Sequence, residues 1–220
     1  MANAHSTVAN NATSIPQVRK LAQTQQKWYP CNNGTSRIYN TPIQTGAALD
    51  AQQGKNPNHL GTCGIVSCVN ILRLAGRVGT AESEVLSYAI SHNLCITNNT
   101  QPAASGGTYP DSRKQILEQF GLESELLPVS IDAIAACVSA GKGVIISVDA
   151  GKLWQNPVYV NCPHAVTVTS VRKDSAGNVE GFYICDSGRG TNDFAHFYTA
   201  EHLKKSLLPR NMNVTTSIIR

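Results

Sequence analysis

The apolar residues of the chain first follow a helical pattern in the stretch that begins at Cys63. They recur there at intervals of three or four positions: Ile65, Val66, Val69 and Leu72. Gly76 follows as a stop signal, so we predict a helix over residues 63–74. Further helices are predicted at 81–91, capped by Thr80, at 110–121, at 131–140, capped by Ser130, and at 200–207.

The second half of the chain is dominated by strand patterns. Residues 144–148 form a continuous apolar run, as in a buried strand, whereas residues 164–171 alternate, as in a half-buried strand. Strands are also predicted at 179–184, 196–198 and 214–219. Helices followed by antiparallel strands predict an α+β domain with two lobes and a cleft between them. Trp154, after the buried strand, is interpreted either as a wall of that cleft or as core packing.

Residues 173–178, Lys-Asp-Ser-Ala-Gly-Asn, have the residue types of a turn and join two of these strands. A turn centred between Ser175 and Ala176 pairs residues whose numbers add up to about 350, as 164 and 186 do. Even-numbered residues of both strands then share one face. Because facing residues lie ~5 Å apart, a carboxylate there can hold an imidazole N–H. We therefore predict that Asp186 lies opposite His164 and orients it.

Cys63 stands at the start of the first predicted helix, between Thr62 and Gly64. Unpaired N–H groups and the positive end of the helix dipole favour thiolate over thiol at that position, and the thiolate is the reactive form. Together with an imidazole and a carboxylate from later in the chain, such a thiol is typical of a cysteine nucleophile. The competing interpretation is a buried structural cysteine, which we expect for Cys68 on the same helix.

Four segments resemble the papain-like cysteine peptidases, and among them the bacterial branch that cleaves double-glycine leaders from bacteriocins. They are GTCGIVSCVNILRLAG, GGTYPDSRKQILEQFGL, GKGVIISVDAG and PHAVTVTSVRKDSAGNVEGFYICDSG, and they occur in the order of the family within residues 50–207. The resemblance implies a papain-like fold with an N-terminal helical lobe and a C-terminal antiparallel sheet. It also implies a peptide or protein substrate, no cofactor or metal, and a triad of Cys63, His164 and Asp186.

The family also uses a Gln shortly before the nucleophile to help bind the oxyanion. The usual spacing, about six residues, falls here on Pro57, which has no side-chain donor. Gln53, Gln52 and Asn58 are the candidates, and Gln53 requires a longer loop through residues 55–59. The backbone N–H of the nucleophile supplies one oxyanion donor in any case.

Length and charge limit the other classes of function. The chain has 220 residues, which suits one domain with an extension, and we divide it into a polar extension or linker at 1–47 and a catalytic domain at 48–220. A net charge of +4 without a Lys/Arg cluster argues against a nucleic-acid partner. No apolar run approaches the ~20 residues of a membrane span.

Seven cysteines without a framework spacing predict mainly reduced thiols and a reducing cytoplasm, with a Cys31–Cys95 bridge as an alternative. A zinc site is a second alternative, with four ligands drawn from Cys63, Cys68, Cys162, His164 and Cys185. No Cys-x-x-Cys pair is present, and the spacing of residues 162 and 164 is unusual for zinc. Both observations argue against the zinc alternative.

A short N-terminal motif suggests a biological context. Val8-Ala-Asn-Asn11 resembles, with Ala in place of Glu, the Val-Glu-Asn-Asn boundary that precedes toxin regions of contact-dependent inhibition proteins. That resemblance implies a toxin or effector module, delivered into a target cell within a larger secreted protein and bound by a cognate immunity protein. Three classes of function stay open: a peptidase, an amidase, deamidase or transglutaminase with the same triad, and a non-catalytic zinc or binding module.

Overall fold

The computed structural model describes residues 28–31, 34–40, 49–190 and 194–220. These residues form one eight-stranded sheet with the strands β1 Trp28–Pro30, β2 Arg37–Tyr39, β3 Ser124–Leu127, β4 Lys142–Asp149, β5 Pro163–Lys173, β6 Val179–Cys185, β7 His196–Thr199 and β8 Met212–Ile218. All paired strands are antiparallel, in the order β1-β2-β5-β4-β8-β3. On the other edge of β5 the sheet continues through β6 to β7.

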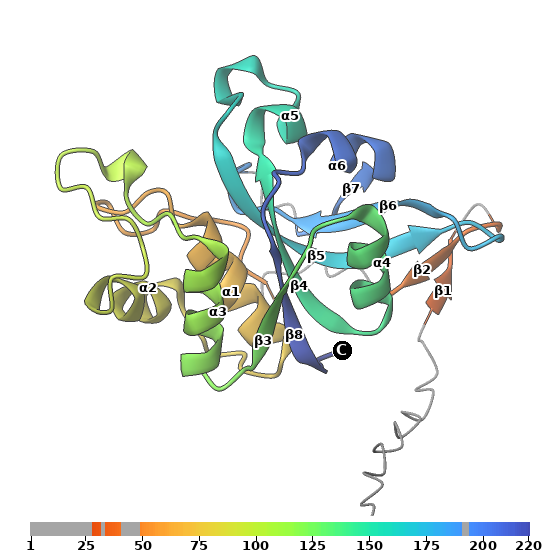
Figure 1. The fold of residues 1–220 in the computed structure, drawn as a ribbon, viewed down its shortest axis with the longest axis horizontal. Coiled ribbons are helices and arrows are strands. Elements are labelled where there is room, and N and C mark those ends of the chain that lie inside the picture. The colour runs from red at the N-terminus through yellow and green to blue at the C-terminus, as the bar shows by residue number, and fades with distance from the viewer. Residues whose placement is uncertain (1–27, 32–33, 41–48, 191–193) are drawn as a thin grey trace, which may run out of the picture.

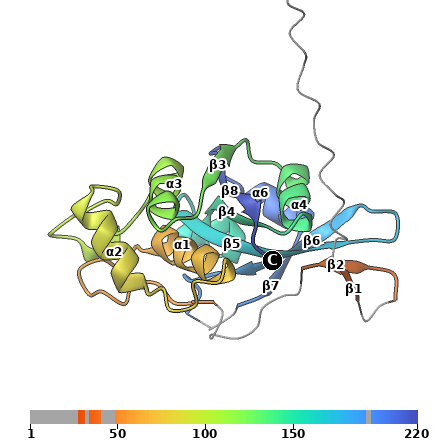
Figure 2. The ribbon, with the colours of Figure 1, turned by 90° about the horizontal axis from the view of Figure 1, so that it is seen from below.

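The described part of the chain also contains helices, with the bounds α1 Cys63–Leu74, α2 Glu82–Ser91, α3 Pro110–Gln119, α4 Ile131–Ser139, α5 Ala150–Trp154 and α6 Ala200–Ser206, and the 3₁₀ turns η1 Pro102–Ala104 and η2 Pro157–Tyr159. The helices α1, α2 and α3 gather beside one end of the sheet, and α4 lies towards its other end (Figures 1 and 2). The predicted α+β architecture, with an N-terminal helical lobe and a C-terminal antiparallel sheet, is confirmed. None of the described helices is both long and apolar enough to cross a membrane.

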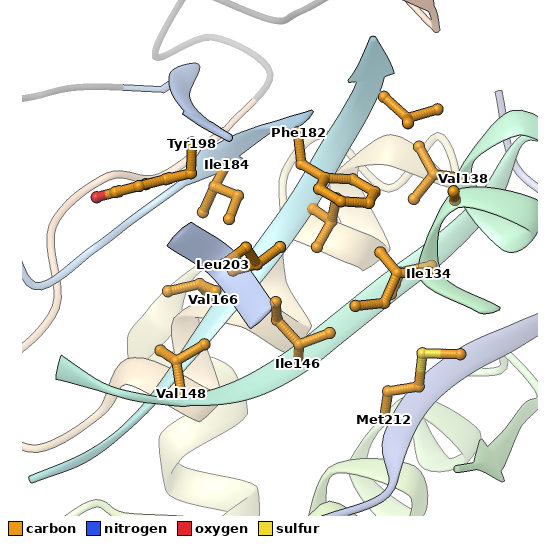
Figure 3. Close-up of a cluster of buried hydrophobic side chains, with 14 of the residues drawn as sticks. Ile134, Val138, Ile146, Val148, Val166, Phe182, Ile184, Tyr198, Leu203 and Met212 are labelled. Atoms are coloured by element: carbon orange, nitrogen blue, oxygen red, sulfur yellow. The ribbon is translucent and has the colours of Figure 1, made fainter. Parts of the chain in front are cut away.

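Alternation along β4 and β5 divides the interior into two cores. Odd-numbered residues, such as Ile145 and Ala165, pack with the apolar residues of α1, α2 and α3. Even-numbered residues, such as Ile146 and Val166, pack with Phe182 of β6 and with α4 and α6 (Figure 3). Because α1 lies against β5, the first residues of the helix come close to the first residues of the strand.

In the β5–β6 hairpin, the predicted residues share one face, but the two strands do not pair in the predicted register. Thr167 pairs with Cys185, so the residue numbers add up to 352 rather than 350. His164 lies opposite Val148 of β4, on the other edge of β5, and Asp186 follows the end of β6. The prediction that His164 and Asp186 face each other directly is therefore wrong. The error of two residues leaves both on the same face, because side chains alternate with a period of two.

The turn of this hairpin explains the difference in register. The backbone N–H of Asp174 donates to the carbonyl of Asn178 at 2.9 Å, which closes a three-residue loop centred on Ala176. Gly177, the last residue of the loop, has a φ of +91°, a conformation that glycine adopts without strain. The loop centred on Ala176 gives a sum of 352 at Lys173 and Val179, and two irregularities, between Arg172 and Lys173 and between Val168 and Ser170, change the sum to 353 and back to 352.

The two predicted helix caps have different outcomes. Ser130 caps α4 as predicted, because its Oγ accepts a hydrogen bond from the backbone N–H of Ala133 at 3.1 Å. The prediction for Thr80 is wrong: the N-cap of α2 is Ala81, and the Thr80 hydroxyl donates to the carbonyl of Arg77 at 2.9 Å. The hydroxyl is therefore used by the preceding turn and not by the helix.

Two short strands precede residue 48. In the sheet β1 pairs with β2, and β2 pairs with the end of β5 from Arg37 opposite Lys173 to Tyr39 opposite Val171. Part of the segment that we assigned to a polar extension thus lies on the same edge of β5 as β4 does. The domain boundary at residues 47 and 48 stays a prediction.

Candidate active site

A cleft with a volume of about 480 Å³ lies where the N-terminus of α1 meets the start of β5. Its wall includes Cys63 from α1, His164 from β5 and Trp154 from α5. Gln53 and Gly188, from two loops, also line it. The fold therefore brings residues from five separate segments of the chain to one place.

Cys63 is positioned by tight packing of its two neighbours. A Cβ on Gly64 would lie 1.9 Å from Oγ1 of Thr108, so only glycine allows α1 to lie this close to the segment before α3. Thr62 is fully buried, and its hydroxyl donates to the carboxylate of Glu82. The Cys63 side chain itself stays partly exposed, in the wall of the cleft.

The thiol of Cys63 lies in surroundings that favour the thiolate. Burial raises its pKa, but the charge on His164, a hydrogen bond with that ring, a backbone hydrogen bond at Ala165 and the charge of Arg113 together lower it below the ordinary value of 9.0. Cys68, on the same helix, is fully buried as predicted. Burial raises the pKa of Cys68 to about 12, against a smaller lowering by Arg113. Position on α1 therefore separates a thiol whose pKa is lowered from one whose pKa is raised.

His164 connects this thiol to a carboxylate. The ring is 6% exposed, and its Nε2 lies 2.7 Å from Oδ1 of Asp186. Burial lowers the pKa of His164, but the charges of Asp186 and Cys63 and the hydrogen bonds with both raise it to about 10. Since Nε2 is used by the carboxylate, Nδ1 is the nitrogen that remains for the thiol. The opposite shifts of the two pKa values favour a thiolate–imidazolium pair.

Asp186 is a fully buried carboxylate with three donors. Besides His164, the indole Nε1–H of Trp154 donates to Oδ2 at 2.7 Å, and the backbone N–H of Gly188 donates to Oδ1 at 2.9 Å. Burial raises the pKa of Asp186, while the charge and hydrogen bond of His164 and the bonds from Trp154 and Gly188 lower it below the ordinary 3.8. The carboxylate is therefore ionised opposite the imidazole.

Trp154 has a function that the sequence analysis did not anticipate. It lines the cleft, as one of the two interpretations required, but it also holds Asp186 and lies edge-on to His164, with 5.2 Å between the ring centroids. A Cβ on Gly188 would lie 2.8 Å from the Trp154 ring and 2.9 Å from Cε1 of His164, so glycine is required there. The available signal was that a buried indole N–H must find an acceptor.

Gln53 lies in the same cleft as Cys63. Its Nε2 donates to the carbonyl of Leu60 at 3.2 Å, and its Oε1 accepts from the hydroxyl of Ser187 at 3.1 Å. The longer loop that this position requires is present, because the intervening segment folds back through a bridge between Asn56 and His59. The other two candidates for the oxyanion do not line the cleft.

The residues of the zinc alternative do not form a metal site. Within the described ranges, no group of three or more His, Cys, Asp or Glu side chains is arranged to hold a metal ion. Cys68 and Cys185 are buried, whereas Cys162 is exposed and lines the cleft. Cys31 and Cys95 are free thiols, so the bridge considered between them is not formed.

No protein-family model and no curated protein matches this sequence. Comparison with solved structures does find similar folds. A C39-like peptidase from Bacillus anthracis is 15% identical, with a TM-score of 0.57 over 78% of this chain and 96% of that chain. The double glycine motif protease of an AMS/PCAT transporter, solved in complex with the leader peptide, is 14% identical, with a TM-score of 0.48 over 80% of this chain and 98% of that chain. The first likeness shows that this chain shares the fold of that C39-like peptidase.

Proposed function

We propose that this protein is a cysteine peptidase in which Cys63 is the nucleophile, His164 the general base and Asp186 the group that orients the imidazole. One observation carries the proposal: Cys63 and His164 line one cleft, and Nε2 of that imidazole lies 2.7 Å from a fully buried carboxylate. Thiol, base and orienting carboxylate in that order are the arrangement of nucleophilic acyl transfer. The fold shared with a C39-like peptidase supports the choice of a peptide bond as substrate.

The proposed reaction has two steps. The Cys63 thiolate attacks the carbonyl carbon of the peptide bond, and His164 gives its proton to the leaving amine as the C–N bond breaks. The acyl group is then held as a thioester. Water adds to the thioester while the neutral imidazole takes one of its protons, and the thiolate leaves as the acid is released. The thiolate–imidazolium pair is thereby restored, and Asp186 stays ionised throughout.

The oxyanion formed in each step needs N–H donors in the cleft. The backbone N–H of Cys63 is the first candidate, because the first N–H groups of a helix have no carbonyl partner within it. The side-chain amide of Gln53 is the second, since it lines the cleft and, among the described residues, its Nε2 donates to the carbonyl of Leu60, at 3.2 Å. Exchange of that carbonyl for the oxyanion would provide the second donor.

Alkylation tests the assignment of the nucleophile. Wild type, Cys63→Ala and Cys162→Ala are treated with limiting iodoacetamide, and the modified residues are located by mass spectrometry. Cys162 is the matched control because it is exposed and lines the same cleft. We expect Cys63 to be modified first at pH 7, since its pKa lies below the ordinary value of 9.0. Equal rates at the two cysteines would contradict an activated thiol at Cys63.

A cleavage profile tests the reaction. A bacterial lysate is incubated with wild type or Cys63→Ala, and new protein N-termini are identified by mass spectrometry. A peptidase produces new N-termini only with the wild type. Parallel incubations with an amine donor and with peptidoglycan test the second class, because an amidase, deamidase or transglutaminase shares the thioester step and differs in substrate or acyl acceptor. Products of those kinds without new N-termini would replace the peptidase assignment.

The toxin context rests on residues 8–11, which lie outside the described residues. We keep as a prediction that the chain is delivered into a target cell and is neutralised by an immunity protein. Expression of wild type in a bacterial cytoplasm should then arrest growth, and expression of Cys63→Ala should not. Equal growth of the two strains would exclude a peptidase toxin acting in that compartment.

A further inference from the structure

Arg113 is a buried charge in the wall of the cleft. It is carried by α3 and is 1% exposed. Its Nε donates to Oδ1 of Asn213 at 2.9 Å, and its Nη2 donates to Oγ of Ser147 at 3.0 Å. Asn213 is itself held by a bond to the carbonyl of Pro110 at 2.8 Å. Neutral partners therefore fix the orientation of the guanidinium, and no described group accepts from its other three N–H donors.

The positive charge of Arg113 has no carboxylate partner among the residues that the structure describes. Buried arginines are normally paired with an acidic group. The cleft also contains Arg210, which lies over the ring of Tyr109 at 5.6 Å from its centroid, and its described lining includes no Asp or Glu. Two arginines thus line the cleft, and no described carboxylate lines it with them.

The nucleophile does not account for both arginines. Arg113 does help to lower the pKa of Cys63, but burial and the interactions with His164 and Ala165 are larger effects, and Arg210 is not among the causes. Burial lowers the pKa of Arg113 itself, the charges of Cys68 and Cys63 raise it, and the like charge of Arg210 adds a smaller lowering. An anion that enters this cleft would meet both positive charges, because Arg113 and Arg210 line the same wall.

We propose that Arg113 and Arg210 bind a carboxylate of the substrate beside the scissile bond, so that the protein selects acidic peptides. This inference rests on the proposed peptidase function and names its substrate class. A guanidinium held in one plane can donate two parallel N–H bonds to a carboxylate. A neutral side chain in the same place would leave both charges unpaired, and that difference is the source of the selectivity.

Cleavage of matched peptides tests the preference. A tryptic digest of a bacterial lysate is incubated with the wild type, and one cleaved peptide is chosen as the parent. Derivatives carry Glu or Gln at each position next to the cleaved bond, or a C-terminal acid or amide, and kcat/KM is measured for each. We expect the acid to be favoured about tenfold or more at one of these places. Preference in the Glu/Gln pairs assigns an acidic side chain, and preference only in the acid/amide pair assigns the C-terminal carboxylate.

Variants connect the preference to the two arginines. Arg210→Gln and Arg113→Gln should each reduce the ratio of kcat/KM between the acid and amide peptides several-fold, and Arg113→Lys should reduce it less, because the charge is kept. A loss of folding would lower both rates and leave their ratio unchanged. Arg210 is only half-buried, so its variant carries the test if Arg113→Gln does not fold. A wild-type ratio near one, or an unchanged ratio in Arg210→Gln, would overturn the proposal.

Alkylation separates failure of this inference from failure of the proposed function. Iodoacetate and iodoacetamide both form an S–C bond with the thiolate and release iodide, but only iodoacetate carries a carboxylate. Their rate ratio at Cys63, relative to the same ratio for N-acetylcysteine, should be raised in the wild type and lowered in Arg210→Gln. If no peptide is cleaved and this pattern holds, the peptidase assignment fails and the carboxylate site stands. Cleavage without either preference leaves the peptidase and removes the carboxylate site.

Discussion

Replacement of Trp154 by Phe tests whether the indole N–H holds the pair formed by His164 and Asp186. The substitution removes the donor that lies 2.7 Å from Oδ2 of Asp186. It keeps an aromatic ring edge-on to His164, where the ring centroids are 5.2 Å apart. Asp186 then retains two of its three donors, from His164 and Gly188.

The expected cost follows from the burial of the acceptor. A hydrogen bond to a charged group contributes about 1.5–3 kcal/mol, and Asp186 has no exposed surface through which water could replace the indole. For a chain of this size each kcal/mol lowers Tm by about 2–4 °C, so we expect a decrease of several degrees at pH 7.

The protonation of Asp186 determines how the difference in Tm between variant and wild type changes with pH. The folded-state pKa of Asp186 lies below 3.8, so its ionisation stabilises the fold above pH 3.8, and that stabilisation is lost as the pH falls through the folded-state pKa. Trp154→Phe raises this pKa towards 3.8. The difference in Tm between variant and wild type should therefore be largest near neutral pH and should shrink as Asp186 becomes protonated.

Thermal unfolding followed by circular dichroism from pH 3 to pH 8 measures this difference. Tyr159→Phe is the matched control for stability, because its ring also packs edge-on against Trp154, at 5.1 Å, and no described group bonds its hydroxyl. We also expect kcat/KM of Trp154→Phe to fall, since His164 is less well oriented. Equal Tm values for Trp154→Phe and Tyr159→Phe across this range would refute the reasoning.

Three further changes have defined outcomes. Gly188→Ala places a Cβ 2.9 Å from the His164 ring and should lower kcat/KM about tenfold or more, whereas Gly79→Ala, with no atom within 4 Å, should match wild type in the same assay. Because the pKa of His164 is raised to about 10, kcat/KM should fall only as the pH rises through about 10. Asp186→Asn removes the largest raising cause, so this limb of the pH profile should move to lower pH, and an unmoved limb would contradict the pairing. Ser130→Ala removes the cap of α4 and should lower the free energy of unfolding in urea by about 0.5–2 kcal/mol.

The elements predicted best from the sequence are those in which the local pattern of apolar residues matches the residues that are buried in the structure. Helix α1 spans Cys63–Leu74 as expected, because its regularly spaced apolar residues pack against the sheet and the neighbouring helices, and residues 64–72 are all buried. Strands β4, β5 and β6 were predicted for the same reason. In contrast, β3 and α5 are short and were not predicted. Strand β3 is defined by its pairing with β8, a contact between residues about ninety positions apart that no local period records.

From the sequence we could predict the residue types of the candidate site and the strand face that they share. The exact pairing of these residues could not be predicted. His164 and Asp186 were expected on one face, and the register error of two residues preserved that relation. The bond from Trp154 could not be predicted, because it depends on the unpredicted helix α5. That helix is capped by Asp149, whose carboxylate accepts from the N–H of Lys152 at 3.0 Å, and it is only five residues long. A helix this short has no repeat of apolar residues in the sequence from which it could be predicted.

The charges along the cleft connect the proposed triad to the proposed carboxylate site. Burial raises the pKa values of Cys63 and Asp186 and lowers that of His164, and in each of the three residues the neighbouring charges and hydrogen bonds reverse the effect of burial. Arg113 differs, because its pKa stays lowered: burial outweighs the attraction of Cys68 and Cys63. A proposed triad of thiolate, imidazolium and carboxylate carries one negative charge in excess, which Arg113 offsets, whereas no described carboxylate lines the cleft beside Arg210. A substrate carboxylate would supply the missing counter-charge, and its binding would bring an acyl group to the thiolate.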